Sequence, residues 1–447
     1  MSLLDNRLPS PGTPGRFPAA QSPRSLADTG LEPTYLIDLL IKTVFRHGIE
    51  RPSAMSLAMK LPVRVIEQIV EMAEHKALVQ KLGQPGANMN AEMKYALTNK
   101  GRAWAQEALS FSDWTGAAPV TLESYVKVMA AQPVRDEVLS RQRLDHVFRN
   151  LVIPEGLMQK LGPAANSAAS MLIYGPPGNG KSTISEALCE AYQDYILVPY
   201  VVAIDNQIIR VFDPEVHVPV AGGHEVVQGL RNNLSYDQRY ALCKRPGLIT
   251  GGELRLDMLD LSYSPDSRTY TAPLQMKANG GVFVVDDFGR QRETPQEIVN
   301  RLIIPLEKRL DYLALQSGRK FEVPFELLVV FSTNKTPEAL VDEAALRRLR
   351  HKILIDRPNR DTFIRIFLRT AQAFGLQADE NILAYVLFDL YGASGRAYSS
   401  FHPKFLCEQT VSICTYEGVA PQLRPEFLRR AWENLTTGPA SEEEAFA

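Results

Sequence analysis

The sequence predicts a mixed chain in which an α/β domain, built on a parallel sheet, is flanked by helical units. The first observation is a set of short, fully apolar segments that alternate with helical patterns between about residues 152 and 358. Runs of this kind are typical of parallel strands covered on both faces. The second observation is the three- and four-residue spacing of apolar side chains in 31–110 and again in 359–437. This spacing predicts amphipathic helices before and after the sheet.

Length and charge limit the classes of protein that fit. The chain has 447 residues, which corresponds to about three domains at roughly 150 residues each. Lys and Arg number 49 and Asp and Glu 51, which gives a net charge of −2. This excludes a protein whose whole surface is basic and binds polyanions such as nucleic acid. The longest apolar run, 195–204, is about half a membrane span and contains Pro199, so no membrane insertion is expected. The four cysteines show neither metal-site nor paired spacing, which favours a cytoplasmic location.

The two ends of the chain are predicted to be disordered. Residues 1–30 contain five prolines and little apolar content, which predicts a disordered leader. Residues 438–447 form an acidic tail.

Residues 31–110 predict a small helical domain. A helix that ends at Gly48, a second over 53–61 and a third from Val63 to about Val79 are followed by a glycine- and asparagine-rich loop. An extended stretch at 94–97 and a helix capped by Thr98 complete the unit. Three helices followed by a hairpin suggest a winged helix-turn-helix domain.

The charges of this domain argue against DNA as its main partner. It holds ten Lys or Arg and eight Asp or Glu, a net charge of +2. The third helix would enter the major groove, yet its expected exposed residues carry a net charge of −2. Those residues are Arg64, Glu67, Gln68, Glu71 and Glu74. A protein-docking module is therefore favoured, with DNA binding kept as the alternative.

The rest of the chain divides into three parts. Residues 111–144 predict a helical connector, 145–358 the α/β domain, and 359–437 a helical unit.

A phosphate-binding loop follows the apolar strand 171–174. It matches Gly-x-x-x-x-Gly-Lys-Ser/Thr between a strand and a helix, the setting that this motif requires. The glycines let backbone N–H groups surround a phosphate, Lys181 reaches the β- and γ-phosphates, and Ser182 is a ligand for Mg²⁺. The loop consists of Gly175, Pro176, Pro177, Gly178, Asn179, Gly180, Lys181, Ser182 and Thr183.

Two acids end the apolar strand 282–285, about 100 residues after the phosphate loop. Asp286 is expected to hold Mg²⁺ through water. Asp287 is expected to orient and deprotonate the attacking water.

Two further polar sites follow in order. Asn334 ends the apolar strand 327–333 and is expected to fix the attacking water beside the γ-phosphate. The next residues, Lys335 to Pro337, lack the acid that would read guanine, so GTP specificity is not expected. Arg347 and Arg348 suit a finger that reaches a neighbouring subunit's γ-phosphate, because arginine stays charged and binds phosphate oxygens bidentately.

These four motifs, in this order, resemble the AAA+ ATPase family over about residues 145–437. Walker A is 175–183, Walker B is 282–287, sensor 1 is Asn334, and the finger is Arg347 or Arg348. The resemblance implies an α/β nucleotide domain, a helical lid, and a ring of subunits, expected to be a hexamer, with ATP at the interfaces. It also places adenine near Leu151 to Ile153.

Two further details resemble particular subgroups of this family. Two strands around Ser317-Gly318 look like the hairpin inserted before sensor 1 in MoxR-like ATPases, and the paired arginines resemble those of Clp-type unfoldases. The block 286–291, together with the winged helix, looks most like a poorly characterised bacterial group of predicted ATPases with chaperone activity.

The sequence departs from the family pattern at two positions. Asp287 stands where most members have Glu, so the attacking water must sit closer or turnover is slow. Sensor 2 is usually Arg; here Lys404 is the candidate, with Arg396 the second choice.

The segment 198–281 is long for its place and predicts a hairpin about Asp205-Asn206. His217 and His224 could bind a metal, although scattered polar loop residues are the favoured interpretation. Tyr263 and Tyr270 could face a pore or simply pack.

Together these observations predict a Mg²⁺-dependent ATPase that acts as a homo-oligomeric ring and remodels a protein client. The alternatives are a DNA-binding ATPase or transcription regulator that acts through the winged helix, and a nucleotide-bound scaffold with little turnover.

Overall fold

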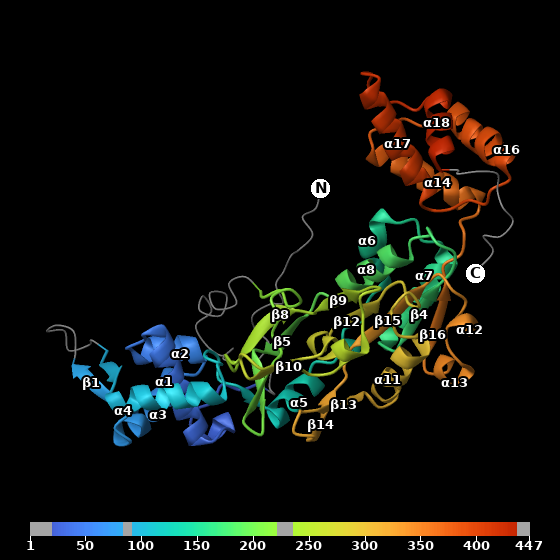
Figure 1. Ribbon diagram of the computed structural model, residues 1–447. Coiled ribbons are helices and arrows are strands. Elements are labelled where there is room, and N and C mark those ends of the chain that lie inside the picture. Colours follow the sequence, from blue (N-terminus) through green and yellow to red (C-terminus); the bar gives the residue numbers. More distant parts are fainter. Residues whose placement is uncertain (1–19, 84–91, 221–235, 436–447) are drawn as a thin grey trace.

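The computed structural model describes residues 20–83, 92–220 and 236–435. Figure 1 shows an N-terminal helical unit at one end, β-rich layers in the middle, and a C-terminal helical unit (orange to red) at the other end. Among the described residues, no helix is both long and apolar enough to cross a membrane.

The N-terminal unit consists of four helices and a short antiparallel ribbon. Glycine at φ +62° ends the first helix at Gly48, and Thr98 caps the last by accepting a hydrogen bond from the Gly101 amide at 3.0 Å. The helices pack around a closed apolar core that includes Leu36, Ile66 and Ile69. The elements are α1 (Pro33–His47), α2 (Pro52–Met59), α3 (Val63–His75), β1 (Val79–Gly83), β2 (Lys94–Leu97) and α4 (Asn99–Phe111).

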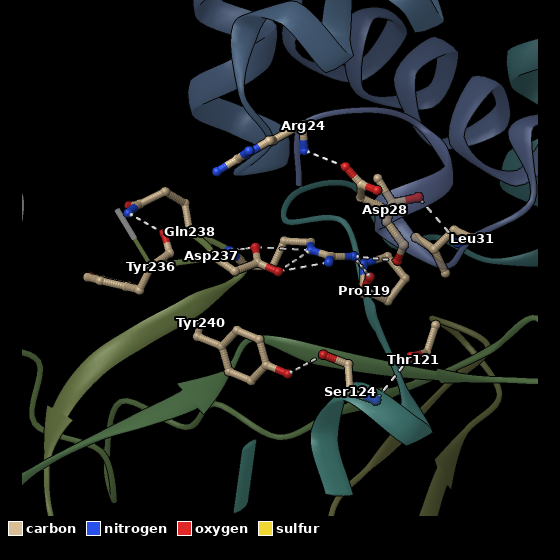
Figure 2. A network of polar contacts seen from close by, with 12 residues as sticks. Arg24, Asp28, Leu31, Pro119, Thr121, Ser124, Tyr236, Asp237, Gln238 and Tyr240 are labelled. Carbon is tan, nitrogen blue, oxygen red and sulfur yellow. Dashed lines mark hydrogen bonds and ion pairs between the residues drawn. The ribbon is translucent and has the colours of Figure 1, made fainter. Parts of the chain in front are cut away.

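The predicted disordered leader is wrong for residues 20–30, while 1–19 and the predicted tail at 438–447 lie outside the described residues. Ala20 is buried in the β-rich core, and a short helix, η1 (Ala27–Thr29), follows it. The Arg239 side chain donates to the carbonyl oxygens of Thr29 at 2.9 Å and Pro119 at 3.0 Å (Figure 2). Backbone carbonyls hold this segment, and for that reason its low apolar content gave no sign of order.

The sheet at the centre of the chain is parallel throughout and confirms the predicted P-loop α/β fold. Its strand order is β16-β4-β15-β12-β9, with the phosphate loop after β4. Parallel strands end at one edge, so the residues that follow β4, β12 and β15 come together there. Separate apolar clusters cover the two faces. The strands are β4 (Met171–Tyr174), β9 (Gly247–Thr250), β12 (Val282–Val285), β15 (Leu328–Thr333) and β16 (His351–Leu354).

Helices and short turns surround this sheet. A capping box at Thr294 and Glu297 starts the longest of them. They are α6 (Arg141–Val147), η3 (Phe148–Asn150), α7 (Glu155–Ser167), α8 (Lys181–Ala191), η4 (Leu256–Leu259), α10 (Leu274–Lys277), α11 (Pro295–Lys308), α12 (Pro337–Leu340) and α13 (Glu343–Leu346).

A second β region lies between the N-terminal unit and the parallel sheet (Figure 1). It contains a sheet of order β10-β11-β7-β6-β3 and the antiparallel pairs β5–β8 and β13–β14, which share one apolar core. Its strands are β3 (Val120–Thr121), β5 (Tyr195–Pro199), β6 (Val201–Ile204), β7 (Gln207–Arg210), β8 (Tyr240–Lys244), β10 (Ser262–Ser264), β11 (Thr269–Thr271), β13 (Leu310–Ala314) and β14 (Lys320–Pro324).

Both predicted hairpins are present in this region. Asp205 and Asn206 have φ of +48° and +63°, the turn conformation that joins β6 to β7. The hairpin before β15 is β13–β14. The connector differs from the purely helical prediction, since β3 pairs with β6 before the helix α5 (Leu122–Ala130) and the turn η2 (Val134–Asp136).

The C-terminal unit is helical around one core that includes Phe363, Phe367 and Leu406. A π-helical stretch, η5, lies in its middle. Its elements are α14 (Arg360–Ala373), α15 (Glu380–Ala384), η5 (Tyr385–Tyr391), α16 (Gly392–Ser394), α17 (His402–Tyr416) and α18 (Pro425–Leu435).

Candidate functional site

The phosphate loop joins β4 to α8 in a conformation that requires glycine. Gly175, Gly178 and Gly180 have φ of +144°, +76° and +86°. A Cβ on Gly175 would lie 2.2 Å from the Ile355 carbonyl oxygen of the neighbouring strand end. The loop therefore keeps its backbone amides available at the N-terminus of α8.

Lys181, the first residue of α8, is buried under this loop. Its Nζ donates to the carbonyl oxygens of Gly175 and Pro176, each at 3.0 Å. Burial lowers the pKa of Lys181 from its usual value, while the carboxylates of Asp286 and Asp287 act in the opposite direction. The ammonium is thus held at the loop with two acids near it.

Asp286 follows β12 and offers a buried oxygen to a cation. Its backbone amide donates to the Thr250 carbonyl oxygen at 2.7 Å. Its Oδ1 is buried and has no hydrogen-bond partner among the described residues. Ser182, in the first turn of α8, lines the same cavity as Asp286. One carboxylate and one hydroxyl beside a phosphate loop fit Mg²⁺, which keeps several waters and takes few protein ligands.

Asp287 lies in an exposed turn with φ +47°, in the left-handed region that few residues other than glycine adopt. Asn334 follows β15 and lines the same cavity as Asp287. The edge of the parallel sheet therefore brings together Lys181, Asp286, Asp287 and Asn334, as the sequence predicts.

These residues line a cavity of about 780 Å³ between the parallel sheet and the C-terminal helical unit. One side of the cavity is polar and is formed by the phosphate loop from Pro177 to Thr183 and the residues after β12 and β15. The lining also contains Leu151, Val152 and Ile153, which the resemblance associates with adenine, and Ile366 and Phe374 of the helical unit. A cavity with phosphate-binding and apolar sides can accept a nucleotide.

The C-terminal helical unit contacts the phosphate loop directly. The Phe401 amide donates to the Gly178 carbonyl oxygen at 2.9 Å, and the Ser400 amide donates to Asn179 Oδ1 at 3.1 Å. Lys404, in the first turn of α17, lines the cavity, whereas Arg396 does not. Lys404 Nζ lies 3.7 Å from Glu408 Oε1, and its side chain is 70% exposed. The geometry therefore favours Lys404 over Arg396 as the sensor-2 candidate.

Arg369 of α14 lines the cavity and is absent from the predicted site. Its Nη1 donates to the Leu151 carbonyl oxygen at 3.1 Å, which ties the helical unit to the segment before the sheet. Ile366, Thr370 and Ala373 line the cavity from the same helix. Their spacing of three and four places them with Arg369 on one helix face, but the spacing alone does not show that this face lines the cavity.

The predicted finger residues do not reach the cavity of their own chain. Arg347 is 75% exposed and pairs with Glu343 at 2.6 Å. Arg348 Nε lies 2.8 Å from Glu307 Oε1. Neither lines the cavity. Within one chain, the structure does not bring them together with the other predicted site residues.

The remaining candidates, the histidines proposed for a metal and the two tyrosines proposed for a pore, make ordinary structural contacts. His217 Nε2 contacts the Lys277 carbonyl oxygen at 2.8 Å, and His224 lies outside the described residues. Among the residues that the structure describes, no group of three His, Cys, Asp or Glu could hold a metal ion. Tyr270 is buried, with its ring 4.9 Å from that of Tyr263, so the two tyrosines pack together.

A family model described as a domain of unknown function (DUF8689) matches residues 359–434, the C-terminal helical unit. No curated protein matches the sequence.

Among solved structures, the chain is similar to NtrX from Brucella abortus in complex with ADP, with 11% identity and a TM-score of 0.38 over 77% of this chain and 63% of that chain. It is also similar to a mutant of RuvB from Thermotoga maritima, with 12% identity and a TM-score of 0.36 over 63% of this chain and 70% of that chain. The chain thus spans less than two thirds of the NtrX chain. TM-scores below 0.5 add nothing to the fold assignment, which rests on the strand order and the phosphate loop.

Proposed function

We propose that the protein is a Mg²⁺-dependent ATPase of the AAA+ type that works as a ring and remodels a protein client. The observation that supports this most is the cavity lined together by the phosphate loop, Asp286, Asp287, Asn334 and Lys404 of the helical unit. Phosphoryl transfer needs mainly positioning and charge stabilisation, and this set of side chains supplies both.

The phosphate loop and its helix bind the triphosphate in this proposal. Backbone amides at the N-terminus of α8 and the Lys181 ammonium face the phosphate oxygens. The apolar residues Leu151 to Ile153 and Phe374 accommodate the base. ATP thereby lies between the sheet and the helical unit, which Phe401 and Arg369 already join.

Ser182 and Asp286 hold the cation. Asp286 Oδ1, which has no hydrogen-bond partner in the part of the chain that the structure describes, is the acceptor that this role requires. Mg²⁺ bound there would neutralise charge on the phosphate oxygens.

Asp287 is the general base, and Asn334 orients the water. The Asp287 carboxylate takes a proton from the attacking water, while the Asn334 amide fixes that water beside the terminal phosphate. The side chain of Asp is one methylene shorter than that of Glu, so the water must lie close to the main chain of β12.

Arg347 and Arg348 act on the site of a neighbouring subunit. Both lie outside the cavity of their own chain, and Arg347 is largely exposed. A guanidinium contributed across a head-to-tail interface completes the site of every subunit only in a closed ring, and we propose a hexamer.

The N-terminal unit is proposed as the docking module for a protein client. On α3, Arg64, Glu67 and Glu71 are exposed. Gln68 accepts a hydrogen bond from the Leu26 amide at 3.2 Å, so the segment before α1 covers part of this helix. An acidic and partly covered helix is a poor reader of DNA, which supports the protein client over the DNA alternative.

Steady-state phosphate release tests the proposal. Purified protein with Mg²⁺ and ATP should release phosphate at a rate per chain that rises with protein concentration as rings assemble. Lys181→Ala should abolish nucleotide binding, and Asp286→Asn should abolish turnover. Mass photometry at the same concentrations should show the assembly. If an assembled wild-type ring released no phosphate, the ATPase proposal would be wrong, and the alternative of a nucleotide-bound scaffold would replace it.

A further inference from the structure

Asp287 adopts a left-handed backbone conformation, which costs free energy in every residue except glycine, although Asp tolerates it better than most. Its φ is +47°, and Gly289, two residues later, has φ +102°. A non-glycine residue stays in the left-handed region only where its surroundings hold it there. The direction of the Asp287 carboxylate therefore depends on the groups that fix this turn.

The main chain on either side of Asp287 is anchored to the neighbouring strands. The Asp286 amide donates to the Thr250 carbonyl oxygen at the end of β9. The Phe288 amide donates to the Ser332 carbonyl oxygen of β15 at 2.7 Å, and Thr333 Oγ1 donates to the Phe288 carbonyl oxygen at 2.7 Å. These contacts fix the two ends of the turn that contains Asp287.

The Arg290 amide donates to the Asp287 carbonyl oxygen at 2.9 Å, and the Gln291 side chain is a second partner of this turn. Its Oε1 accepts from the Gly289 amide at 2.8 Å. Its Nε2 lies 3.2 Å from the Asp286 carbonyl oxygen and 3.4 Å from that of Asp287, and donates to the Gly251 carbonyl oxygen at 3.0 Å. One amide thus binds both ends of the Asp287 turn and connects them to the segment after β9.

We propose that Gln291 is the positioning residue for Asp287, holding the carboxylate toward the water in the cavity. This inference rests on the proposed function, since it assigns Gln291 a role only through the general base. Gln291 itself does not line the cavity, so its loss should leave nucleotide contacts in place.

Gln291→Ala and Gln291→Glu test the assignment, each with Gln296→Ala as the control. Glutamate keeps the acceptor toward Gly289 but places an oxygen where Nε2 faces three carbonyl groups. Gln296 is a matched control, because it is a half-buried glutamine whose Nε2 donates to Asn300 Oδ1 and Asp342 Oδ2 and whose Oε1 accepts from the Asp342 amide. The measurements are kcat for phosphate release, Kd for a fluorescent ATP analogue, and thermal stability.

The expected result is a fall in kcat of at least about tenfold in both Gln291 variants, with Kd and Tm close to wild type and with Gln296→Ala unchanged. Wild-type kcat in Gln291→Ala would overturn the assignment, as would a loss of kcat that comes with an equal loss of nucleotide affinity or of Tm. A wild-type protein that releases no phosphate is a different outcome, since it overturns the proposed function together with this inference.

Discussion

The backbone amide of Phe401 donates to the carbonyl oxygen of Gly178, and this bond joins the C-terminal helical unit to the phosphate loop. Gly178 has φ +76°, and a Cβ there would lie 2.3 Å from Phe401 Cδ1. The glycine therefore serves both the loop conformation and the contact with the helical unit. The contact therefore links the loop that lines the cavity directly to the start of α17.

Gly178→Ala should destabilise the protein more than Gly180→Ala does. Both glycines have positive φ, but a Cβ on Gly180 would meet no atom of the described residues within 4 Å. The conformational cost of roughly 1–2 kcal/mol is common to both variants. Displacement of the Phe401 ring should cost Gly178→Ala about 1 kcal/mol more. Urea unfolding without nucleotide measures the difference, and equal losses would show that the contact contributes nothing.

Arg369→Ala should weaken ATP binding about tenfold, which corresponds to ~1.4 kcal/mol. The variant removes the bond from α14 to the Leu151 carbonyl oxygen at the edge of the cavity. Arg365→Ala is the control, because Arg365 is an exposed arginine on the same helix that does not line the cavity. Titration with a fluorescent ATP analogue gives both dissociation constants. Equal affinities in the two variants would remove Arg369 from the site.

Arg239→Ala should destabilise the folded chain by about 3–5 kcal/mol, since it leaves a buried carboxylate without its partner. Arg239 and Asp237 are each 3% exposed and lie 2.7 Å apart (Figure 2). Arg319→Ala breaks the exposed pair with Asp205 and should cost less than about 1 kcal/mol. Denaturant unfolding of the three proteins checks this. A loss below about 1 kcal/mol in Arg239→Ala would mean that this pair does not hold the N-terminal segment.

Lys42→Met should stabilise the protein at neutral pH by about 1–3 kcal/mol, because it removes a buried charge. Lys42 lies in α1, is 5% exposed and donates to the Ser112 carbonyl oxygen at 2.9 Å. Burial lowers the pKa of Lys42 to about 8, against the opposing effect of Asp38 and Asp113. Between pH 8 and about 10.5 the unfolded chain binds more protons at this site, so the contribution of Lys42 to stability rises with pH.

The advantage of the Lys42→Met variant should therefore be largest below pH 8 and should shrink toward pH 10.5. Comparison of variant and wild type at each pH cancels the other titrating groups. Lys127→Met, at an exposed position, should show no such trend. A pH-independent difference between Lys42→Met and wild type would contradict the cause assigned to the shift.

The parts of the fold that the sequence predicted are those set by local pattern. The fully apolar runs of β12 and β15, the glycines of the phosphate loop and the Asp205-Asn206 turn each specify their structure within a few residues. The motif order then placed Asp286 and Asn334 at one sheet edge, because parallel strands end together.

The missed parts depend on contacts between distant segments. β3 pairs with β6, with Val120 opposite Val202, and no local sequence pattern predicts this pairing. Residues 20–30 carry little apolar content and are held by Arg239 through backbone carbonyls. Arg369 enters the site only because α14 packs against the segment that contains Leu151. In all three cases the stabilising contact joins residues that are far apart in the sequence. A local sequence pattern therefore does not predict it.

Complementation between two inactive variants tests the central claim most directly. Asp287→Asn removes the general base but keeps the fingers, while Arg347→Ala with Arg348→Ala keeps the base but removes the fingers. Arg350→Ala, an exposed arginine nearby, is the control and should keep full activity. The two inactive chains are co-expressed with different tags, purified on both tags, and assayed for phosphate release. Each variant alone should be inactive, and mixed rings should recover up to about a quarter of wild-type activity, because one interface in four pairs an intact base with intact fingers. Full activity in the double arginine variant alone, or mixed rings that remain inactive, would contradict a site completed by the neighbouring subunit.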